Sequence, residues 1–303
     1  MSAAVTRETS ARRNTLWANA ALATSGCLWG TGFLFGKIAF REMTVSDNVC
    51  YRFIFGCTLL LPILLRKKKF FRGSDLRLLL VASFIGVPVQ FLLQFKGLQL
   101  TTVSHASLIV GALPVLLALS SVWFLHERLN RVEWIVLFIS PLGVLTIALS
   151  TRNSSNASGP SLTGDLLVFI SMLAATVMIL LTKRLSANYD SLQITSWMLV
   201  LGCVELLVIV ECMHPIGFHF SRHIWLAAAA QGVLATAAAY LCWNWGLAHV
   251  PASRAAVFLN LEPLLGTFLG VMILHETLGP MAILGGAMIL GPAIYFSRKP
   301  ATV

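Results

Sequence analysis

Ten apolar segments of roughly equal length, separated by short polar stretches, constrain this chain more than any other feature. A helix needs about 20 mostly apolar residues to cross a bilayer. The sequence therefore predicts an all-α membrane protein with ten transmembrane helices. The expected spans lie at 16–40, 46–65, 74–95, 103–124, 132–150, 162–182, 191–211, 224–246, 252–274 and 280–296.

The composition excludes a water-soluble protein. The chain is 57% hydrophobic and only 11% charged, whereas soluble domains carry about 25% charged residues. The net charge of +10 would suit nucleic acid, but the basic residues lie in short loops between apolar segments, where charge sets orientation. We therefore expect the lipid bilayer and a small-molecule substrate as partners, and no nucleic acid.

The distribution of Lys and Arg predicts how the chain is threaded. Cytoplasmic loops carry an excess of these residues. With the N-terminus inside, most basic residues fall on the inner side, and the outer side keeps only Arg41, Lys96, Arg152 and Arg222, with Lys37 close by. We expect both termini to be cytoplasmic in a multi-pass protein of the cell membrane, with tails at 1–15 and 298–303. The polar start leads directly into a full-length span, so no cleavable signal peptide is expected.

An internal repeat divides the chain into two halves. A shift of 149 positions lays 97–129 on 246–278 without a gap, with roughly a third of the positions identical and Pro114 on Pro263. Earlier in each half, a shift of 146 places Lys37 on Lys183. Agreement of this extent exceeds what apolar composition alone would give.

The repeat predicts an inverted architecture. The first five-helix repeat covers 16–150, a Ser/Asn/Gly-rich linker covers 151–161, and the second repeat covers 162–297. Five is an odd number of crossings, so the second half must enter the membrane in the opposite direction. Many secondary transporters have this architecture and bind substrate near the midplane between the repeats.

Several stretches resemble the EamA-type branch of the drug/metabolite transporter superfamily. They are "LWGTGFLFGKIAF", "YRFIFG" and the paired "ALPVLLALSSVWFLHERL" and "LEPLLGTFLGVMILHETL". The resemblance covers nearly the whole chain and is closest to the amino-acid exporters of that family. It implies a central cavity lined by spans one to four and six to nine, with spans five and ten at the periphery. The chain departs from a symmetric pattern at two pairs of equivalent positions in the repeats. Glu262 corresponds to Leu113, and Arg254 corresponds to His105.

Glu262 is the most unusual residue of the expected spans. It lies nine residues past Ser253, or about 14 Å along a helix, close to the middle of a ~30 Å hydrocarbon core. A carboxylate at that depth costs about 2.5–3.5 kcal/mol, so it must face a wet cavity, have a partner or be protonated. We expect it to bind a substrate amine or to carry a proton under a proton gradient. A neutral acid bonded to a neighbouring helix is the alternative.

Two prolines are expected to break helices at the same depth. Pro263 has no N–H to give to the carbonyl of Leu259, and Pro114 has none for Val110. An irregular backbone inside the membrane is tolerated where it lines a cavity. A simple packing kink is the alternative reading at both positions.

Arg52 is the second intramembrane charge. It either faces the cavity or extends its long side chain outward to the membrane surface. A pair with Glu205, at a similar depth, is a further alternative. The remaining predicted substrate-binding residues are polar or aromatic side chains on the expected spans: Gln90, Gln94, Tyr240, Trp243, Asn244 and Trp29. For these aromatics, packing or an interfacial position is the competing interpretation.

No enzyme signature is present in the sequence. It contains no GxSxG elbow, no HExxH and no phosphate-binding Gly-Lys-Ser/Thr loop, so neither catalysis nor a cofactor or metal is expected. The six cysteines lie in or beside apolar segments without a CxxC pair, as packing residues do. The sequence therefore predicts a secondary transporter that exports small metabolites, most of all amino acids, by alternating access. A carrier of sugars or nucleotide derivatives is the alternative, and an intramembrane enzyme is a more distant one.

Overall fold

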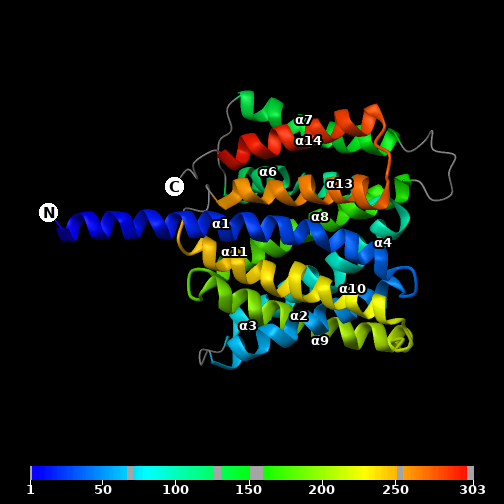
Figure 1. Ribbon diagram of the computed structural model, residues 1–303, viewed down its shortest axis with the longest axis horizontal. Coiled ribbons are helices and arrows are strands. Elements are labelled where there is room, and N and C mark those ends of the chain that lie inside the picture. The colour runs from blue at the N-terminus through cyan, green and yellow to red at the C-terminus, as the bar shows by residue number, and fades with distance from the viewer. Residues whose placement is uncertain (1, 67–70, 126–130, 151–159, 251–254, 299–303) are drawn as a thin grey trace.

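The computed structural model describes residues 2–66, 71–125, 131–150, 160–250 and 255–298. Within these ranges every regular element is a helix, which confirms the all-α prediction (Figure 1). The first half contains α1 (Ser2–Ala39), α2 (Val45–Arg66), α3 (Ser74–Phe84), η1 (Ile85–Val89), α4 (Gln90–Leu100), α5 (Val103–Val110), α6 (Leu113–Leu125) and α7 (Arg131–Ser150). The second half contains α8 (Leu162–Leu185), α9 (Ser191–Met213), α10 (Arg222–Gly232), η3 (Val233–Ala238), α11 (Ala239–Leu247), η4 (Ala256–Asn260), α13 (Leu261–Leu274) and α14 (Pro280–Arg298).

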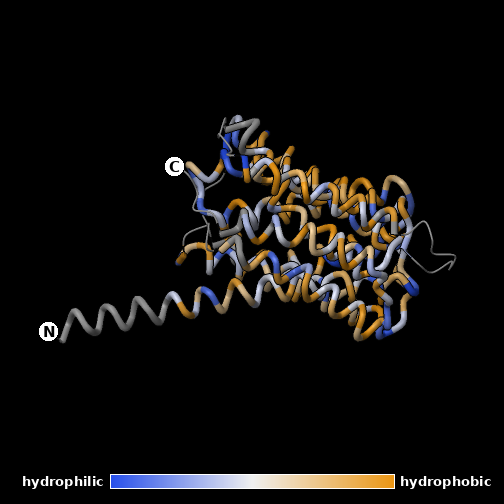
Figure 2. Tube along the Cα trace, turned by 90° about the horizontal axis from the view of Figure 1, so that it is seen from above, coloured by the Kyte–Doolittle hydropathy of each residue, from blue (hydrophilic) through white to orange (hydrophobic). Residues whose placement is uncertain are grey.

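Five helical stretches of the described residues are long and apolar enough to cross a membrane: Ser74–Leu100, Val103–Ser120, Leu162–Leu185, Ser191–Met213 and Arg222–Leu247. Shorter apolar helices cover Trp134–Ile147, Phe258–Leu274 and Pro280–Pro292. Hydrophobic residues extend along the body of the bundle, and hydrophilic ones gather toward its ends (Figure 2). The chain is thus a multi-pass membrane protein, and the number of ten spans stays a prediction.

The predicted N-terminal tail is continuous with helix α1, and most of the predicted linker and C-terminal tail lies outside the described residues. Helix α1 begins at Ser2, so no helix boundary separates 1–15 from the first span. This stretch contains three Ala and three Arg, which favour helix. Most of the linker, at 151–159, and most of the C-terminal tail, at 299–303, lie outside the described residues.

The two halves share helix boundaries at equivalent positions. Gln90 begins α4 and Ala239 begins α11, 149 positions later. Ala39 ends α1 and Leu185 ends α8, 146 positions later. The two shifts found in the sequence therefore coincide with helix boundaries, and the structure has two repeats.

A wide helical turn interrupts the third predicted span of each repeat. The π-helical segment η1 separates α3 from α4, and η3 separates α10 from α11. Pro88 in η1 has no N–H to donate, which disrupts the regular ladder there. The predicted spans at 74–95 and 224–246 did not include these interruptions, because π-turns carry little local signal and η3 has no proline.

The first helices of the two repeats run in opposite directions. Thr101 accepts a hydrogen bond from Lys37 near the end of α1, and donates one to Asp165 at the start of α8. Helix α1 therefore ends where α8 begins. At the opposite end of the bundle, Leu22 of α1 packs against Gly246 of α11. This arrangement is the inversion that an odd number of crossings requires.

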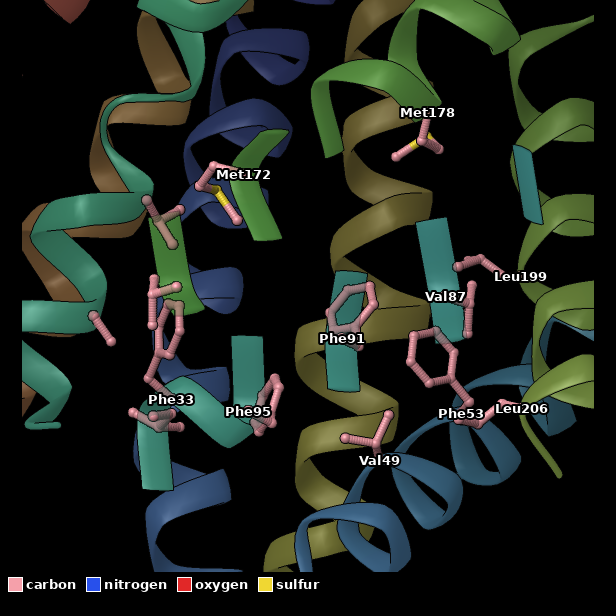
Figure 3. Packing of buried hydrophobic residues seen from close by; sticks show 14 of the residues in the cluster. Phe33, Val49, Phe53, Val87, Phe91, Phe95, Met172, Met178, Leu199 and Leu206 are labelled. Atoms are coloured by element: carbon pink, nitrogen blue, oxygen red, sulfur yellow. The ribbon is translucent and has the colours of Figure 1, made fainter. Parts of the chain in front are cut away.

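Helices α7 and α14 form a pair at one edge of the bundle (Figure 1). Close backbone contact holds this pair together, since a Cβ on Gly143 would lie 2.7 Å from the carbonyl oxygen of Gly285. The other helices enclose the apolar interior. Phe33 and Phe95 lie close to each other there, and Phe91 lies near Phe53 (Figure 3).

Candidate functional site

A cavity of about 580 Å³ lies between the two repeats. Its volume falls within the range of small-molecule sites, about 300–1,000 Å³. All eight residues predicted to bind substrate line it: Trp29, Arg52, Gln90, Gln94, Tyr240, Trp243, Asn244 and Glu262. None of its described lining residues belongs to α7 or α14, in agreement with the peripheral position that the family resemblance implies for spans five and ten.

Arg52 points inward from α2. The residue is only 5% exposed, and its Nε donates to Thr236 Oγ1 at 2.9 Å while Nη2 donates to the carbonyl of Ala235 at 3.2 Å. Both acceptors belong to η3, where the wide turn presents backbone carbonyls away from the regular ladder. A side chain that bonds inside the protein and lines the cavity cannot also extend to the membrane surface. The structure therefore favours the cavity-facing alternative for Arg52.

Aromatic rings surround the Arg52 guanidinium. Its Cζ lies 4.5 Å from the centre of the Phe91 ring and 5.2 Å from that of Phe95. A cation over an aromatic face is stabilised by the ring quadrupole, more so where water is excluded. These two phenylalanines were not among the predicted site residues. Their spacing from Gln90 and Gln94 along one helix was the available signal.

Three aromatic side chains cluster on the wall formed by α1 and α11. Trp29 meets Tyr240 edge to face, with ring centres 5.4 Å apart, and lies 5.4 Å from Trp243. All three line the cavity. Such a cluster offers flat apolar surface and negative ring faces to a ligand, including a cationic one.

The amides of the cavity differ in how much hydrogen-bonding capacity they retain. Gln90 Oε1 is buried and has no hydrogen-bond partner among the described residues. Asn244 already donates to Tyr240 O at 2.8 Å and to Thr195 Oγ1 at 3.4 Å. Gln90 therefore keeps an unused acceptor, buried in the wall of the cavity, whereas Asn244 is largely engaged within the protein.

Glu262 lies in the first turn of α13 and lines the cavity. Its carboxylate forms no hydrogen bond or ion pair with any side chain of the described ranges. Helix α1 passes close beside it: a Cβ on Gly30 would lie 2.8 Å from the Glu262 carbonyl oxygen and 3.0 Å from Gly266 N. Small residues permit this approach of two helices in a membrane, which fixes the backbone that carries the acid.

Both prolines lie at the point where a helix is interrupted. Pro114 is the second residue of α6, which follows a turn at Gly111 and Ala112 after α5. Pro263 is the third residue of α13, which follows the 3-10 segment η4. A proline is well tolerated in the first turn of a helix, where its missing N–H has no intrahelical partner. The two breaks are therefore changes of helix rather than kinks within one helix.

The alternative pair between Arg52 and Glu205 is absent from the described structure. Glu205 accepts hydrogen bonds from Ser83 Oγ at 3.0 Å, while Arg52 bonds to η3. The two charges have similar depths along α2 and α9, but a common depth does not place two side chains on facing sides of their helices.

Polar contacts hold together one end of the bundle around the connection between α4 and α5, beyond the residues that line the cavity. The carboxylate of Asp165 accepts from Thr101 Oγ1 at 2.5 Å and lies 3.2 Å from His105 Nδ1. Glu276 accepts from the N–H groups of Val103 and Ser104 at 2.7 and 2.8 Å. Phe33 and Phe95, which line the cavity, stack with ring centres 6.3 Å apart (Figure 3). We call this region, comprising Lys37, Thr101, His105, Asp165 and Glu276, the clamped end.

The opposite end of the cavity is polar. Its lining includes Lys183 and Ser186 from the end of α8, Ser191 and Thr195 from the start of α9, and Leu247 from the end of α11. Lys183 and Ser191 are exposed. We call this region the mouth, and it lies on the side that the Lys and Arg distribution predicts to be cytoplasmic.

Comparison with known proteins places this architecture in a family. The profile described as the EamA-like transporter family matches residues 16–149 and again residues 162–298. The two matches fall on the two repeats. A solved crystal structure with 17% sequence identity covers 91% of this chain and 95% of its own, with a TM-score of 0.64, so the fold is similar as well.

Similar proteins cover nearly the full length. The uncharacterized transporter YetK of Bacillus subtilis is 24% identical over 276 residues, which are 89% of this chain and 83% of that protein. An uncharacterized transporter of Archaeoglobus fulgidus is 26% identical over 270 residues, 89% of this chain and 94% of that protein. Because the family profile matches both halves, this chain belongs to the EamA-like transporter family, and it is a membrane transporter rather than an enzyme.

Proposed function

We propose that this protein exports small zwitterionic metabolites, most of all amino acids, by alternating access through the cavity between its repeats. The observation that carries the proposal is the pairing of one arginine and one glutamate on the wall of a single cavity. Arg52 would hold the substrate carboxylate, and Glu262 would face its amine. The tails are proposed to be cytoplasmic, with the protein in the cell membrane.

The donors near Arg52 suit a carboxylate. Two of the guanidinium nitrogens bond to Thr236 and Ala235, which leaves Nη1 for a ligand in the cavity. A guanidinium offers five N–H donors in a planar fork, so it can hold protein acceptors and a ligand together. Gln90 adds an amide beside it.

The wall near Glu262 suits an amine and an apolar side chain. A carboxylate without a side-chain partner can bind an ammonium group, and the attraction between the two charges is stronger in a site of low polarity. The Trp29, Tyr240 and Trp243 rings add surface for the remaining part of the substrate. Glu262 also remains the proposed proton carrier if transport is driven by a proton gradient.

A sugar or nucleotide derivative is the alternative cargo. A phosphate group would call for several convergent basic side chains. Arg52 is buried in the wall, whereas Lys183 lies exposed at the mouth, so the two cations do not converge. An uncharged sugar would leave Arg52 and Glu262 unmatched.

The proposal is tested by transport in proteoliposomes. Purified protein is assayed for counterflow with a panel of radiolabelled amino acids, and unlabelled amino acids, sugars and nucleotides are offered as competitors, with and without a proton gradient. We expect saturable counterflow of at least one amino acid that sugars do not inhibit. Inhibition by sugars or nucleotides alone would replace the amino-acid assignment with the alternative cargo.

The proposed orientation has its own test. We expect an impermeant thiol reagent applied outside cells to label an engineered cysteine at Ser154 but not one at Lys68; both positions lie outside the described residues. Labelling of both positions, or of Lys68→Cys alone, would contradict the orientation and the count of spans.

A further inference from the structure

A lysine near the end of α1 holds the clamped end together. Lys37 Nζ donates to the carbonyl oxygen of Leu98 at 2.9 Å and to that of Thr101 at 2.5 Å. These two carbonyls belong to the last turn of α4 and the residue that follows it. The last carbonyls of a helix lack intrahelical donors and lie at its negative end, where a cation is favourable. Lys37 thus ties the first helix of the repeat to the connection between α4 and α5.

The second repeat contains every part of the same arrangement. Lys183 lies 146 positions after Lys37, near the end of α8, the counterpart of α1. Leu247 and Val250 lie 149 positions after Leu98 and Thr101. Leu247 ends α11, the counterpart of α4. The backbone acceptors that correspond to those of Lys37 are therefore the carbonyls of Leu247 and Val250.

The second arrangement is open where the first is closed. Lys183 and Leu247 both line the mouth of the cavity. Lys183 is exposed, and its ammonium group forms no hydrogen bond or ion pair with any residue in the described ranges. Equivalent residues thus differ within one molecule: the lysine binds the helix-end carbonyls at the clamped end, and at the mouth it binds no described residue.

We propose that Lys183 is the lock of the opposite conformation. When the mouth closes, its ammonium group binds the carbonyls of Leu247 and Val250, as Lys37 now binds those of Leu98 and Thr101. Lys37 releases its carbonyls when the clamped end opens. The two lysines are positioning residues: each stabilises closure of one end and takes no part in binding the substrate. This inference rests on the proposed alternating access, but not on the identity of the cargo.

The geometry of an inverted repeat supports the exchange. In such transporters alternating access comes largely from rocking or gating of one repeat against the other around a fixed site. Because the two repeats share one fold, the closed arrangement of the first repeat is the natural template for closure of the second. A hydrogen bond seen in one repeat then has a counterpart in the other state. A lysine suits this role because its flexible stem can release one pair of carbonyls and leave the ammonium group in water.

The experiment measures how accessible the cavity is from each side. Ala175 lines the cavity midway along α8, and it belongs neither to the proposed substrate contacts nor to the two locks. Ala175→Cys is introduced into a full-length chain whose native cysteines are replaced. Its labelling rate with an impermeant thiol reagent is then measured from each side of the membrane in proteoliposomes of determined orientation.

The two lysine variants are expected to shift accessibility in opposite directions. Lys37→Met removes the lock of the clamped end, so labelling from that side should rise, and labelling from the mouth should fall. Lys183→Met removes the lock of the other state, so labelling from the clamped side should fall. Each shift should be roughly tenfold, because a hydrogen bond to a charged group contributes about that factor to an equilibrium. The double variant should return toward the ratio of the parent.

Two controls separate this role from folding and from membrane orientation. Arg184→Met removes a neighbouring exposed cation of the same turn, and it should leave the labelling ratio unchanged. Lys183→Arg keeps a donor cation and should retain most of the parent ratio. Variants are compared only after size-exclusion chromatography shows equal recovery of folded protein.

Two results would overturn the proposal: a ratio unchanged in Lys183→Met, or the same direction of shift in both lysine variants. Equal shifts in Lys183→Met and Arg184→Met would assign Lys183 to membrane orientation alone. Failure of the cargo assignment is seen separately in the counterflow assay. Opposite shifts without amino-acid counterflow would keep the two locks and reject only the cargo.

Discussion

The two repeats supply equivalent positions to one cavity but different chemistry. Arg52 of the first repeat corresponds to Met198 of the second, and Glu262 of the second corresponds to Leu113 of the first. All four residues line the cavity. The fold therefore repeats the geometry of the wall, while the charges are divided, with the cation in one repeat and the acid in the other.

The same division extends along the wall of α4 and α11. Gln94 corresponds to Trp243, and Phe91 corresponds to Tyr240, at a shift of 149 positions. Each of these side chains lines the cavity. A symmetric site would accept a ligand in either of two orientations. For the proposed zwitterionic cargo, the divided charges would favour one, with its anionic part toward the first repeat and its cationic part toward the second.

The largest effect is expected from the cation of the first repeat. Arg52→Ala removes an ionic hydrogen-bond donor worth about 1.5–3 kcal/mol, so counterflow should fall by on the order of 100-fold. Arg52→Lys keeps the charge but loses the planar fork, and we expect a strong though smaller loss. Met198→Leu, at the equivalent position of the second repeat, is the matched control and should transport nearly normally. Wild-type transport by Arg52→Ala would show that the divided charges do not bind the cargo.

Much of this cavity could be predicted from the sequence. Depth counted along expected spans located Arg52 and Glu262, and the repeat placed Pro114 and Pro263 at equivalent breaks. These inferences rest on spacing along one helix, which the helical rise fixes. Helix bounds agreed for the same reason, as for α9, predicted at 191–211 and observed at Ser191–Met213.

Contacts between helices were harder to predict. The bonds of Arg52 depend on η3, a wide turn without a proline. The acceptors of Lys37 are backbone carbonyls, which every residue possesses and no sequence pattern marks. The suggested pair of Arg52 with Glu205 failed because depth along a helix does not determine which neighbour a side chain faces.

The acid of the second repeat is expected to give the next largest effect. Glu262→Gln preserves shape but cannot ionise. If Glu262 binds the substrate amine, both counterflow and gradient-driven accumulation should weaken roughly tenfold, as expected for a lost charge-assisted hydrogen bond. If it carries a proton, accumulation should be lost while counterflow persists. Leu113→Met at the counterpart position is the control. Little change in either assay would mean that Glu262 is a structural acid and that the second repeat contributes no charge to substrate binding.

A smaller effect should come from the contact that joins the two repeats beside the site. Gly30→Ala would place a methyl group 2.8 Å from the Glu262 carbonyl oxygen. Overpacking of this kind costs about 1–3 kcal/mol, and we expect a melting temperature in detergent lower by a few degrees, with reduced transport. Gly291→Ala in α14 has open space within 4 Å and serves as the control. Equal stability of the two variants would mean that α1 and α13 can separate without loss.

The smallest effect is expected at an aromatic position of the second repeat whose counterpart in the first repeat, Gln94, carries no ring. Trp243→Phe keeps a ring beside Trp29, 5.4 Å away in the parent protein. It removes part of the aromatic surface of the cavity wall, which the counterpart Gln94 lacks. Aromatic contacts contribute about 0.5–1.5 kcal/mol beyond burial, so the half-saturating concentration should rise roughly threefold. Substrates with bulky side chains should be affected more than small ones, because only they reach this wall. The matched control is Trp134→Phe on α7, outside the cavity. If all substrates responded equally to Trp243→Phe, the ring would support the fold of α11, and the chemical division between the repeats would rest on Arg52 and Glu262 alone.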